Sequence, residues 1–264
     1  MPITIAINGA AGRMGQRLVA LGSEDKSLEL VACFEYSGHP KFGQDAGDVA
    51  GIGELGLHLV DQTDETYEAI IDFSVPEGAH AAIERAVQAK AALVMATTGL
   101  EEQHKAKIRE AANVIPIVWA PSMSTTVNLT MKLCEIAADA LKDIQGGADV
   151  EIMERHHRYK EDSPSGTALR FGELIANKMG ITKHIHGREG RPGKRPHDEI
   201  AYHAIRTGDN PGEHTIIFGL LGETMELTVR ASNRDCYASG ALQAAKFAAG
   251  KKPGLYSMND VLGL

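Results

Sequence analysis

One short segment at the start of the chain limits its possible folds more than any other. Residues Ile3 to Ile7 are rich in β-branched side chains, Gly9 to Gly15 contain three glycines, and apolar residues at helical spacing begin with Met14. This order predicts a strand, a glycine turn and a helix. Such a turn lets backbone N–H groups and the positive end of a helix approach a pyrophosphate without interference from Cβ atoms. The alternative is a glycine turn that only packs a helix against a sheet.

The next strand strengthens the dinucleotide interpretation. It is expected at Leu30 to Phe34, one helix length further along the chain, and Glu35 follows it directly. A carboxylate at this place can accept hydrogen bonds from an adenosine ribose. The glycines have Gly-x-x-Gly-x-x-Gly spacing instead of the usual Gly-x-Gly-x-x-Gly, so the context carries more weight than the spacing alone.

Strands and helices continue to alternate up to about residue 125. Apolar runs predict strands at Ala69 to Phe73, Leu93 to Ala96 and Val114 to Trp119, with helices at His80 to Ala91 and Glu101 to Ala112. This alternation predicts a parallel sheet covered on both faces. Ligands bind at the carboxyl ends of such strands. The residues that follow the strands are therefore candidates for a ligand site, with ordinary loop residues as the alternative: Ser74 and Pro76, Thr97 to Gly99, and Ala120 to Met123.

The pattern changes from about Thr126. A helix is expected at Val127 to Leu141, a strand at Asp149 to Met153, a helix at Thr167 to Met179, and strands at Glu199 to Arg206, His214 to Leu221 and Thr224 to Arg230. Successive strands with short turns predict an α+β domain with a mixed or antiparallel sheet. The last helical run, Gly240 to Ala249, is expected to pack on the first domain. We thus predict a Rossmann-type nucleotide domain at 1–125 and 236–264, and a substrate-binding and oligomerisation domain at 126–235.

The composition narrows the possible partners. With 264 residues, 43% of them hydrophobic, the chain can bury the cores of two modest domains. A net charge of -8 argues against nucleic acid or anionic lipid as a partner. No basic leader precedes the first apolar run and no later run could span a bilayer, so we expect a cytoplasmic protein. Cys33, Cys134 and Cys236 are widely spaced and include no Cys-x-x-Cys pair, which predicts neither disulfides nor a metal site.

The segment Glu154 to Ala168 is the densest in proton-transfer groups. It holds His156, His157 and Lys160, and it ends in Ser165-Gly166-Thr167-Ala168. Histidine and lysine suit protonation of an anionic substrate, and a helix that starts at such a turn offers free N–H groups to a carboxylate. The alternatives are a solvated basic loop and a metal site. Adjacent histidines rarely share one metal ion, which disfavours the metal site.

The stretch Lys183 to His197 is basic and rich in glycine. It contains Lys183, Arg188, Arg191, Lys194 and Arg195 within an otherwise acidic protein. A lid over a small dianion and a merely solvated loop are equally compatible with this pattern.

Several of these segments together resemble the 4-hydroxy-tetrahydrodipicolinate reductase family, also called dihydrodipicolinate reductases. Glu154 to Ala168 is similar to the family signature E-x-H-H-x-x-K-x-D-x-P-S-G-T-A. The similarity extends through Gly9 to Gly15, Thr97 to Gly99, Gly187 to Gly190 and Gly212 to His214, in the order found in the family. It therefore covers nearly the whole chain.

The resemblance implies a homotetrameric, NAD(P)H-dependent oxidoreductase with a Rossmann domain and a substrate domain. Its reaction would be the reduction of 4-hydroxy-tetrahydrodipicolinate to tetrahydrodipicolinate, with loss of water, in the diaminopimelate route of lysine biosynthesis. By position, His156 would be the acid/base residue and Lys160 the proton donor. His157, Gly166 and Thr167 would hold the carboxylates of the small dicarboxylate substrate.

The cofactor site implied by the resemblance lies in the first half of the chain. The pyrophosphate would be held by Gly9, Ala10, Ala11, Gly12, Arg13 and Met14, the ribose by Glu35 and Tyr36, and the nicotinamide by Ala96, Thr97, Thr98, Ala120, Pro121, Ser122 and Met123. Tyr36 stands where many members have an arginine, and it brings no charge to compensate a 2′-phosphate. Because Glu35 repels a 2′-phosphate, we expect use of both cofactors with a lean toward NADH.

Two other functions fit part of the sequence. Another two-domain dehydrogenase, acting on an amino acid or a polyol, would share the nucleotide half but not the His-His-x-x-Lys and Ser-Gly-Thr pairing. A dinucleotide-sensing regulator would bind the cofactor without turnover. Oxidation of NAD(P)H that depends on added substrate separates both from a reductase.

Overall fold

The chain folds into two compact units. The structure, a computed structural model, describes residues 1–264. Unit 1 comprises Met1–Thr125 and Arg234–Leu264, and unit 2 comprises Thr126–Asn233. Unit 2 is therefore inserted into the chain of unit 1.

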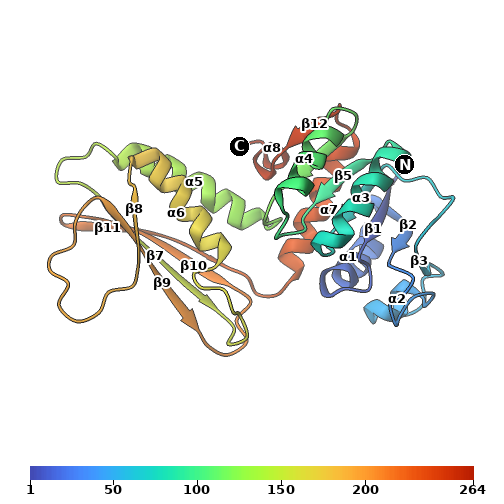
Figure 1. Cartoon of the computed structure of the whole chain (residues 1–264), viewed down its shortest axis with the longest axis horizontal. Coiled ribbons are helices and arrows are strands. Elements are labelled where there is room, and N and C mark those ends of the chain that lie inside the picture. The colour runs from blue at the N-terminus through green and yellow to red at the C-terminus, as the bar shows by residue number, and fades with distance from the viewer. The chain divides into compact units, whose positions relative to one another are not determined.

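Unit 1 is built on a seven-stranded sheet in the order β12-β6-β5-β4-β1-β2-β3, and every pair of neighbours is parallel (Figure 1). The strands are β1 (Ile3–Asn8), β2 (Leu28–Phe34), β3 (Leu59–Val60), β4 (Ala69–Asp72), β5 (Ala92–Met95), β6 (Pro116–Trp119) and β12 (Gly254–Tyr256). The helices are α1 (Arg13–Glu24), α2 (Ala46–Ala50), α3 (Pro76–Ala89), α4 (Glu102–Ala111), α7 (Asp235–Ala249) and α8 (Met258–Leu262).

Alternate residues of the central strand enter different cores. Ile5 and Ile7 of β1 belong to a cluster with apolar residues of α1 and α7, whereas Ala6 between them belongs to a cluster with α3 and α4. Successive side chains of a strand point to opposite faces, so helices cover both faces of the sheet. The predicted parallel sheet of the Rossmann type is confirmed.

Helix α7 closes unit 1 after the chain returns from unit 2. Its small residues let it approach the sheet closely, and a Cβ atom at Gly240 would overlap the carbonyl oxygen of Met123. The helix contacts β4, β5 and β6 as well as α1. A larger side chain at Gly240 would therefore separate the helix from the backbone it packs on.

Unit 2 is a mixed sheet with helices on one face. Its order is β11-β10-β7-β9-β8; β7, β8 and β9 are parallel, and β10 is antiparallel to both β7 and β11. The elements are α5 (Thr125–Leu141), β7 (Asp149–His156), α6 (Gly166–Met179), β8 (Lys183–His186), β9 (Glu199–Arg206), β10 (Glu213–Leu220) and β11 (Glu223–Arg230). Apolar residues of α5 and α6 share one core with the sheet, which confirms the predicted α+β fold.

Two expectations about unit 2 were wrong in detail. Strand β7 continues to His156 instead of ending at Met153, because its alternating burial is maintained by Glu154 and His156, which are buried despite their charge or polarity. The start of the expected basic loop is strand β8, which pairs with β9.

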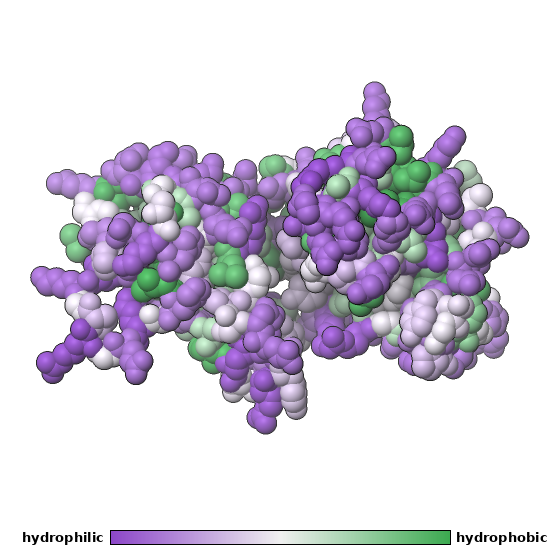
Figure 2. All heavy atoms as spheres, in the orientation of Figure 1, coloured by the Kyte–Doolittle hydropathy of each residue, from purple (hydrophilic) through white to green (hydrophobic).

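One face of the protein is mostly polar (Figure 2). Figure 2 shows, on the face in view, hydrophilic residues over most of both units, with hydrophobic residues in small groups among them. None of the helices combines the length and the apolar character needed to cross a membrane.

Candidate active site

The glycine turn after β1 brings backbone segments into close contact. Gly9 has a φ of 76°, and a Cβ atom there would lie 3.1 Å from Cα of Ser74. A Cβ atom at Gly15 would overlap the carbonyl oxygen of Gly9, and one at Gly12 would lie 3.2 Å from the same oxygen. Gly15 thus allows α1 to pack on the turn, and Gly9 and Gly12 keep the mouth of the turn open to a ligand.

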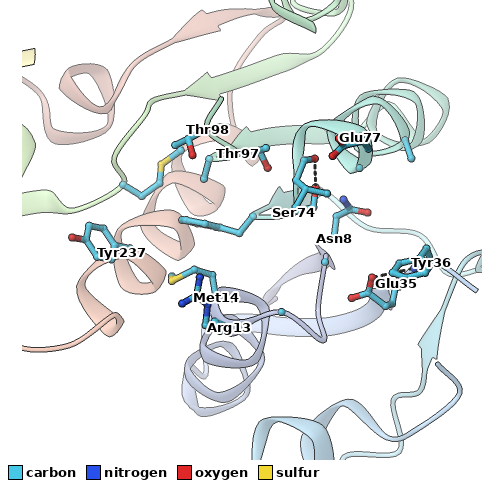
Figure 3. A pocket seen from close by; sticks show the side chains of 18 of the residues that line it. Asn8, Arg13, Met14, Glu35, Tyr36, Ser74, Glu77, Thr97, Thr98 and Tyr237 are labelled. Atoms are coloured by element: carbon cyan, nitrogen blue, oxygen red, sulfur yellow. Dashed lines mark hydrogen bonds between the residues drawn. The ribbon is translucent and has the colours of Figure 1, made fainter. Parts of the chain in front are cut away.

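A cavity of about 910 Å³ opens over this turn at the carboxyl ends of the strands (Figure 3). Twelve of the fifteen predicted cofactor residues line it: Gly9, Gly12, Arg13, Met14, Glu35, Tyr36, Ala96, Thr97, Thr98, Pro121, Ser122 and Met123. The other three, Ala10, Ala11 and Ala120, are buried and do not line it. Glu35 and Tyr36 lie at one end of the cavity and Tyr237 at the other. Its size and position suit a dinucleotide.

The carboxylate of Glu35 is fixed by the turn it faces. Its Oε2 accepts a hydrogen bond from the backbone N–H of Ala11 at 3.1 Å, and its Oε1 accepts one from the N–H of Tyr36 at 3.2 Å. The ring of Tyr36 is 62% exposed and lies edge-on to His39, with 5.5 Å between ring centroids. The end of β2 therefore presents an acceptor beside an exposed aromatic ring.

A buried polar network supports the floor of the cavity. Asp72, fully buried at the end of β4, accepts hydrogen bonds from the amide of Asn8 and the hydroxyl of Thr97, both at 2.7 Å. Arg85 donates to Asn8 at 2.8 Å and packs over the ring of Phe34. Burial raises the pKa of Asp72, although hydrogen bonds from Ser74, Asn8 and Thr97 oppose the shift. The network ties together the ends of β1, β4 and β5.

In unit 2, the end of β7 places two polar side chains in the interior of the protein. Glu154 and His156 are 1% and 8% exposed, whereas the intervening Arg155 points to the other face and pairs with Glu213. Oε2 of Glu154 lies 2.5 Å from Nδ1 of His156. Arg206 of β9 donates to both oxygens of Glu154 at 2.8 Å. Burial alone would raise the pKa of Glu154, but the hydrogen bonds from His156 and Arg206 lower it to about 2.

His214 of β10 completes this cluster. Its Nε2 lies 3.0 Å from the hydroxyl of Ser165, and its ring is edge-on to His156 with 5.2 Å between centroids. Burial and the nearby His156 lower the pKa of His214 to about 4. His214 is therefore neutral near pH 7 and contributes no charge to the cluster.

Helix α6 begins with unpaired backbone donors. Ser165 is its N-cap, and the hydroxyl accepts from the N–H of Ala168 at 3.2 Å. The N–H groups of Gly166 and Thr167 precede the first possible acceptor within the helix, so the fold leaves them without an intrahelical partner. A Cβ atom at Gly166 would meet nothing within 4 Å. This helix start can bind a carboxylate.

The remaining predicted side chains lie on the loop after β7. Nζ of Lys160 lies 2.7 Å from Oδ1 of Asp162, and its backbone N–H donates to the carbonyl of His157. The backbone N–H of His157 donates to the carbonyl of Asn210 at 2.8 Å. The buried Nδ1 of the His157 ring has no hydrogen-bond partner. The loop thus carries both groups next to the start of α6 in the sequence.

Two of the three arginines of the basic stretch are held by carboxylates. Arg188 contacts Glu151 and Glu199 at 2.7 and 2.9 Å, and Arg195 contacts Glu151 and Asp149 at 2.8 and 2.7 Å. Neither the lid nor the solvated loop describes these two side chains, which brace the sheet. Their partners are too distant in sequence for the pattern to show this.

The predicted residues fall into two sets. The cofactor set lies in unit 1, and the acid/base and carboxylate-binding set lies in unit 2. Sequence patterns missed Asp72, Arg85 and Tyr237 in unit 1 and the buried Glu154–Arg206 pair in unit 2. Of these residues, only Glu154 could have been found from the sequence, since it continues the strand alternation up to His156.

Comparisons with known proteins identify relatives of the whole chain. The family models described as dihydrodipicolinate reductase, N-terminus and C-terminus, match residues 3–123 and 126–262. The 4-hydroxy-tetrahydrodipicolinate reductase of Rhodopirellula baltica is 56% identical over 271 residues, covering 100% of this chain and 97% of the relative. That of Alkalilimnicola ehrlichii is 46% identical, covering 100% of both.

Among solved structures, dipicolinate-bound dihydrodipicolinate reductase from Paenisporosarcina sp. TG-14 is similar to this chain. It is 23% identical with a TM-score of 0.77, covering 97% of this chain and 98% of that chain. This likeness supports the fold described above.

Proposed function

Because the chain belongs to the dihydrodipicolinate reductase family and is an NAD(P)H-dependent 4-hydroxy-tetrahydrodipicolinate reductase of lysine biosynthesis, we propose that its two units divide the reaction. Unit 1 holds the dinucleotide in the cavity above the glycine turn. Unit 2 binds the dicarboxylate and supplies the proton, with His156 and Lys160 as acid/base residues.

One observation carries the assignment to unit 2. Gly166 and Thr167, whose N–H groups are free, begin a helix shortly after His156 and Lys160 in the sequence. An anion-binding helix start beside two proton-transfer groups suits an anionic substrate that must be protonated during reduction. His157 adds a further donor for a carboxylate.

The reaction balances as one hydride and one proton added and one water lost. When bound, the reduced nicotinamide supplies the hydride. Hydride addition places electron density on a dianionic substrate, and a nearby cationic donor stabilises that density by delivering the proton. Lys160 and His156 are the groups of the right type, and Gly166, Thr167 and His157 orient the substrate through its carboxylates.

For the cofactor, we propose that both NADH and NADPH are used, with a lean toward NADH. Glu35 is oriented by Ala11 to accept from the ribose hydroxyls, and Tyr36 brings no charge that would compensate a 2′-phosphate. His39 also lines the cavity and Lys41 lies two residues beyond it in the sequence, which supports some use of NADPH.

We further propose a homotetramer assembled through the open face of the unit 2 sheet, opposite α5 and α6. Met153 and Ile205 on neighbouring strands of this face are 37% and 41% exposed. Light scattering is expected to give the mass of four chains, and Ile205→Lys is expected to reduce it. The three free thiols support a reducing compartment such as the cytoplasm.

The test of function is a coupled assay. A synthase condenses pyruvate with aspartate semialdehyde, and the absorbance of NAD(P)H is followed after addition of this protein. We expect oxidation that depends on both condensation substrates. Binding of NAD(P)H without turnover would support a sensor instead, and turnover only with another substrate would support a different dehydrogenase.

The test of the substrate site is competition. Dipicolinate, the pyridine-2,6-dicarboxylate bound by the Paenisporosarcina relative, carries two carboxylates that match the donors at the start of α6. It should compete with substrate and not with the cofactor. If it fails to compete at millimolar concentration, or competes only with NAD(P)H, the site is assigned wrongly.

A further inference from the structure

We propose that Glu154 is a positioning residue that holds His156 in the tautomer with Nε2 free to exchange a proton. The proposal rests on the acid/base role of His156 proposed above. It assigns a function to a carboxylate that is buried and hydrogen-bonded to other groups of the protein.

The contact between the two side chains determines which nitrogen carries the proton. An ionised carboxylate only accepts hydrogen bonds, so Nδ1 of His156, 2.5 Å from Oε2 of Glu154, must donate. Neutral His156 then bears its proton on Nδ1 and its lone pair on Nε2. The low pKa of Glu154, about 2, keeps the carboxylate ionised throughout the neutral range.

Glu154 is itself fixed in orientation. Arg206 donates to both of its oxygens, and the backbone N–H of Ser165 donates to Oε1 at 3.1 Å. Arg206 also donates to the carbonyl of Asp162 at 2.7 Å. The carboxylate therefore cannot turn away from His156 without breaking several charge-assisted hydrogen bonds.

The other edge of the imidazole borders a position without a side chain. A Cβ atom at Gly212, whose φ is 151°, would lie 2.9 Å from Nε2 of His156. The N–H of Gly212 is held by the side chain of Asn210 at 2.8 Å, and its carbonyl accepts from Ala231. Any other residue there would press on Nε2, so the fold keeps this nitrogen free of side chains on the Gly212 side.

Among the charged and titratable groups around His156, only Glu154 can hold the proton on Nδ1. Glu154 on β7 is the anion in contact with Nδ1. Arg206 on β9 and Lys160 on the loop after β7 are cations without a lone pair to accept this proton, and His214 on β10 is neutral. Removal of the Glu154 carboxylate should therefore weaken the preference for a proton on Nδ1.

The direct experiment is ¹⁵N NMR of the histidine rings in the full chain. The resonances of His156 are identified among the 11 histidines by their absence from His156→Gln. In the parent, neutral His156 is expected as the Nδ1–H tautomer. In Glu154→Gln, whose amide can donate as well as accept, the share of the Nε2–H tautomer is expected to increase.

Glu151→Gln is the matched control. Glu151 lies on the same strand and is paired with arginines in the same way, but it contacts Arg188, Arg195 and His203 and not His156. Its variant should leave the tautomer of His156 unchanged. If both variants change the tautomer alike, the effect is a general loss of negative charge and the proposal fails.

Kinetics connect the geometry to the reaction. Glu154→Gln is expected to lower kcat about 100-fold and to move its pH profile, with cofactor affinity within about twofold of the parent. An Nε2–H tautomer in the parent, which needs no variant to observe, overturns the proposal. A changed tautomer with normal kcat in Glu154→Gln also overturns it, whereas normal kcat in His156→Gln removes the proposed function of His156 instead.

Discussion

Asp72 in unit 1 and Glu154 in unit 2 are almost equally buried, but their pKa values are shifted in opposite directions. Asp72 is 0% exposed and its pKa is raised; Glu154 is 1% exposed and its pKa is lowered to about 2. The difference lies in their partners. Asp72 accepts from neutral groups, the Asn8 amide and the Thr97 hydroxyl, whereas Glu154 faces a guanidinium and an imidazole.

The comparison shows that burial alone does not determine charge. Neutral donors satisfy the oxygens of Asp72 without compensating the loss of hydration, so the fold favours its protonated form. A bidentate guanidinium compensates Glu154, so the fold favours its ionised form. The buried acid of unit 1 joins strand ends, and the buried acid of unit 2 contacts His156.

The largest expected effect comes from removing the cation. Arg206→Leu leaves the Glu154 charge buried without its bidentate partner and should destabilise unit 2 by about 3–5 kcal/mol. Arg85→Leu, the matched change in unit 1, removes a donor to neutral Asn8 and should cost about 1–2 kcal/mol.

The single tryptophan allows the two units to be followed separately. Trp119 lies in β6 of unit 1, so its fluorescence reports unfolding of that unit, while far-ultraviolet circular dichroism reports both. In urea, Arg206→Leu should move the dichroism transition and leave most of the Trp119 transition in place. Equal losses of stability in Arg206→Leu and Arg85→Leu would contradict the contrast between the two buried acids.

The second prediction separates chemistry from cofactor binding. His156→Gln and Lys160→Ala should each lower kcat by roughly 100-fold or more, the scale for loss of a general acid, because we propose both as acid/base residues of unit 2. Fluorescence titration should show NAD(P)H affinity within about twofold of the parent. Arg158→Ala, an exposed position in the same segment, is the control and should retain kcat. Near-normal kcat in either variant excludes that residue from the mechanism.

The third prediction places a guanidinium beside Glu35 in unit 1, as Arg206 places one beside Glu154 in unit 2. Tyr36→Arg places a guanidinium beside Glu35, where it can bind a 2′-phosphate with about 1.5–3 kcal/mol, roughly tenfold or more in affinity. kcat/KM for NADPH should therefore rise more than that for NADH, measured at one ionic strength. Tyr36→Phe is the control without charge. A parent that already prefers NADPH tenfold would show that another residue supplies the cation.

The smallest effect tests the sign of the Asp72 shift. A raised pKa means that the contribution of Asp72 to stability is present at low pH and is lost as pH rises through the folded pKa. Asp72→Asn cannot ionise, so its cost, about 1 kcal/mol below the ordinary value of 3.8, should shrink as the pH rises above that value, as followed by Trp119 in urea.

Glu154 should show the reverse dependence. Its pKa falls from an ordinary 4.5 to about 2, so its contribution is present above about pH 4.5 and is lost as pH falls toward 2. The advantage of the parent over Glu154→Gln should therefore decrease below pH 4.5. The same pH trend for the Asp72 and Glu154 variants would contradict the comparison.

The sequence predicted the elements whose periodicity is regular. Strand β9 was predicted with its observed bounds because its first half is apolar and its ends are charged. The cofactor cavity followed from residues adjacent in sequence to strand ends, where topology alone brings them together. Twelve predicted residues line it for that reason.

The parts that escaped prediction depend on distant partners. The end of β7 was placed too early because Glu154 and His156 are polar residues at inward-facing positions, where a sequence pattern expects apolar ones. Arg206, whose guanidinium compensates the buried charge of Glu154, is 52 residues away in the sequence. Strand β8 was taken for loop because its side chains are mostly exposed. Propensity cannot reveal an edge strand of four residues that is stabilised by its neighbour.

The insertion of unit 2 also determines the order in which the protein can be completed during synthesis. Helix α7 and strand β12 follow residue 233, so a ribosome has made all of unit 2 before the last pieces of unit 1 emerge. Until then the sheet lacks its edge strand, and the apolar surface that Ala241 and Ala245 cover lies bare. Unit 2 can fold first, whereas unit 1, although it begins the chain, must complete its folding last.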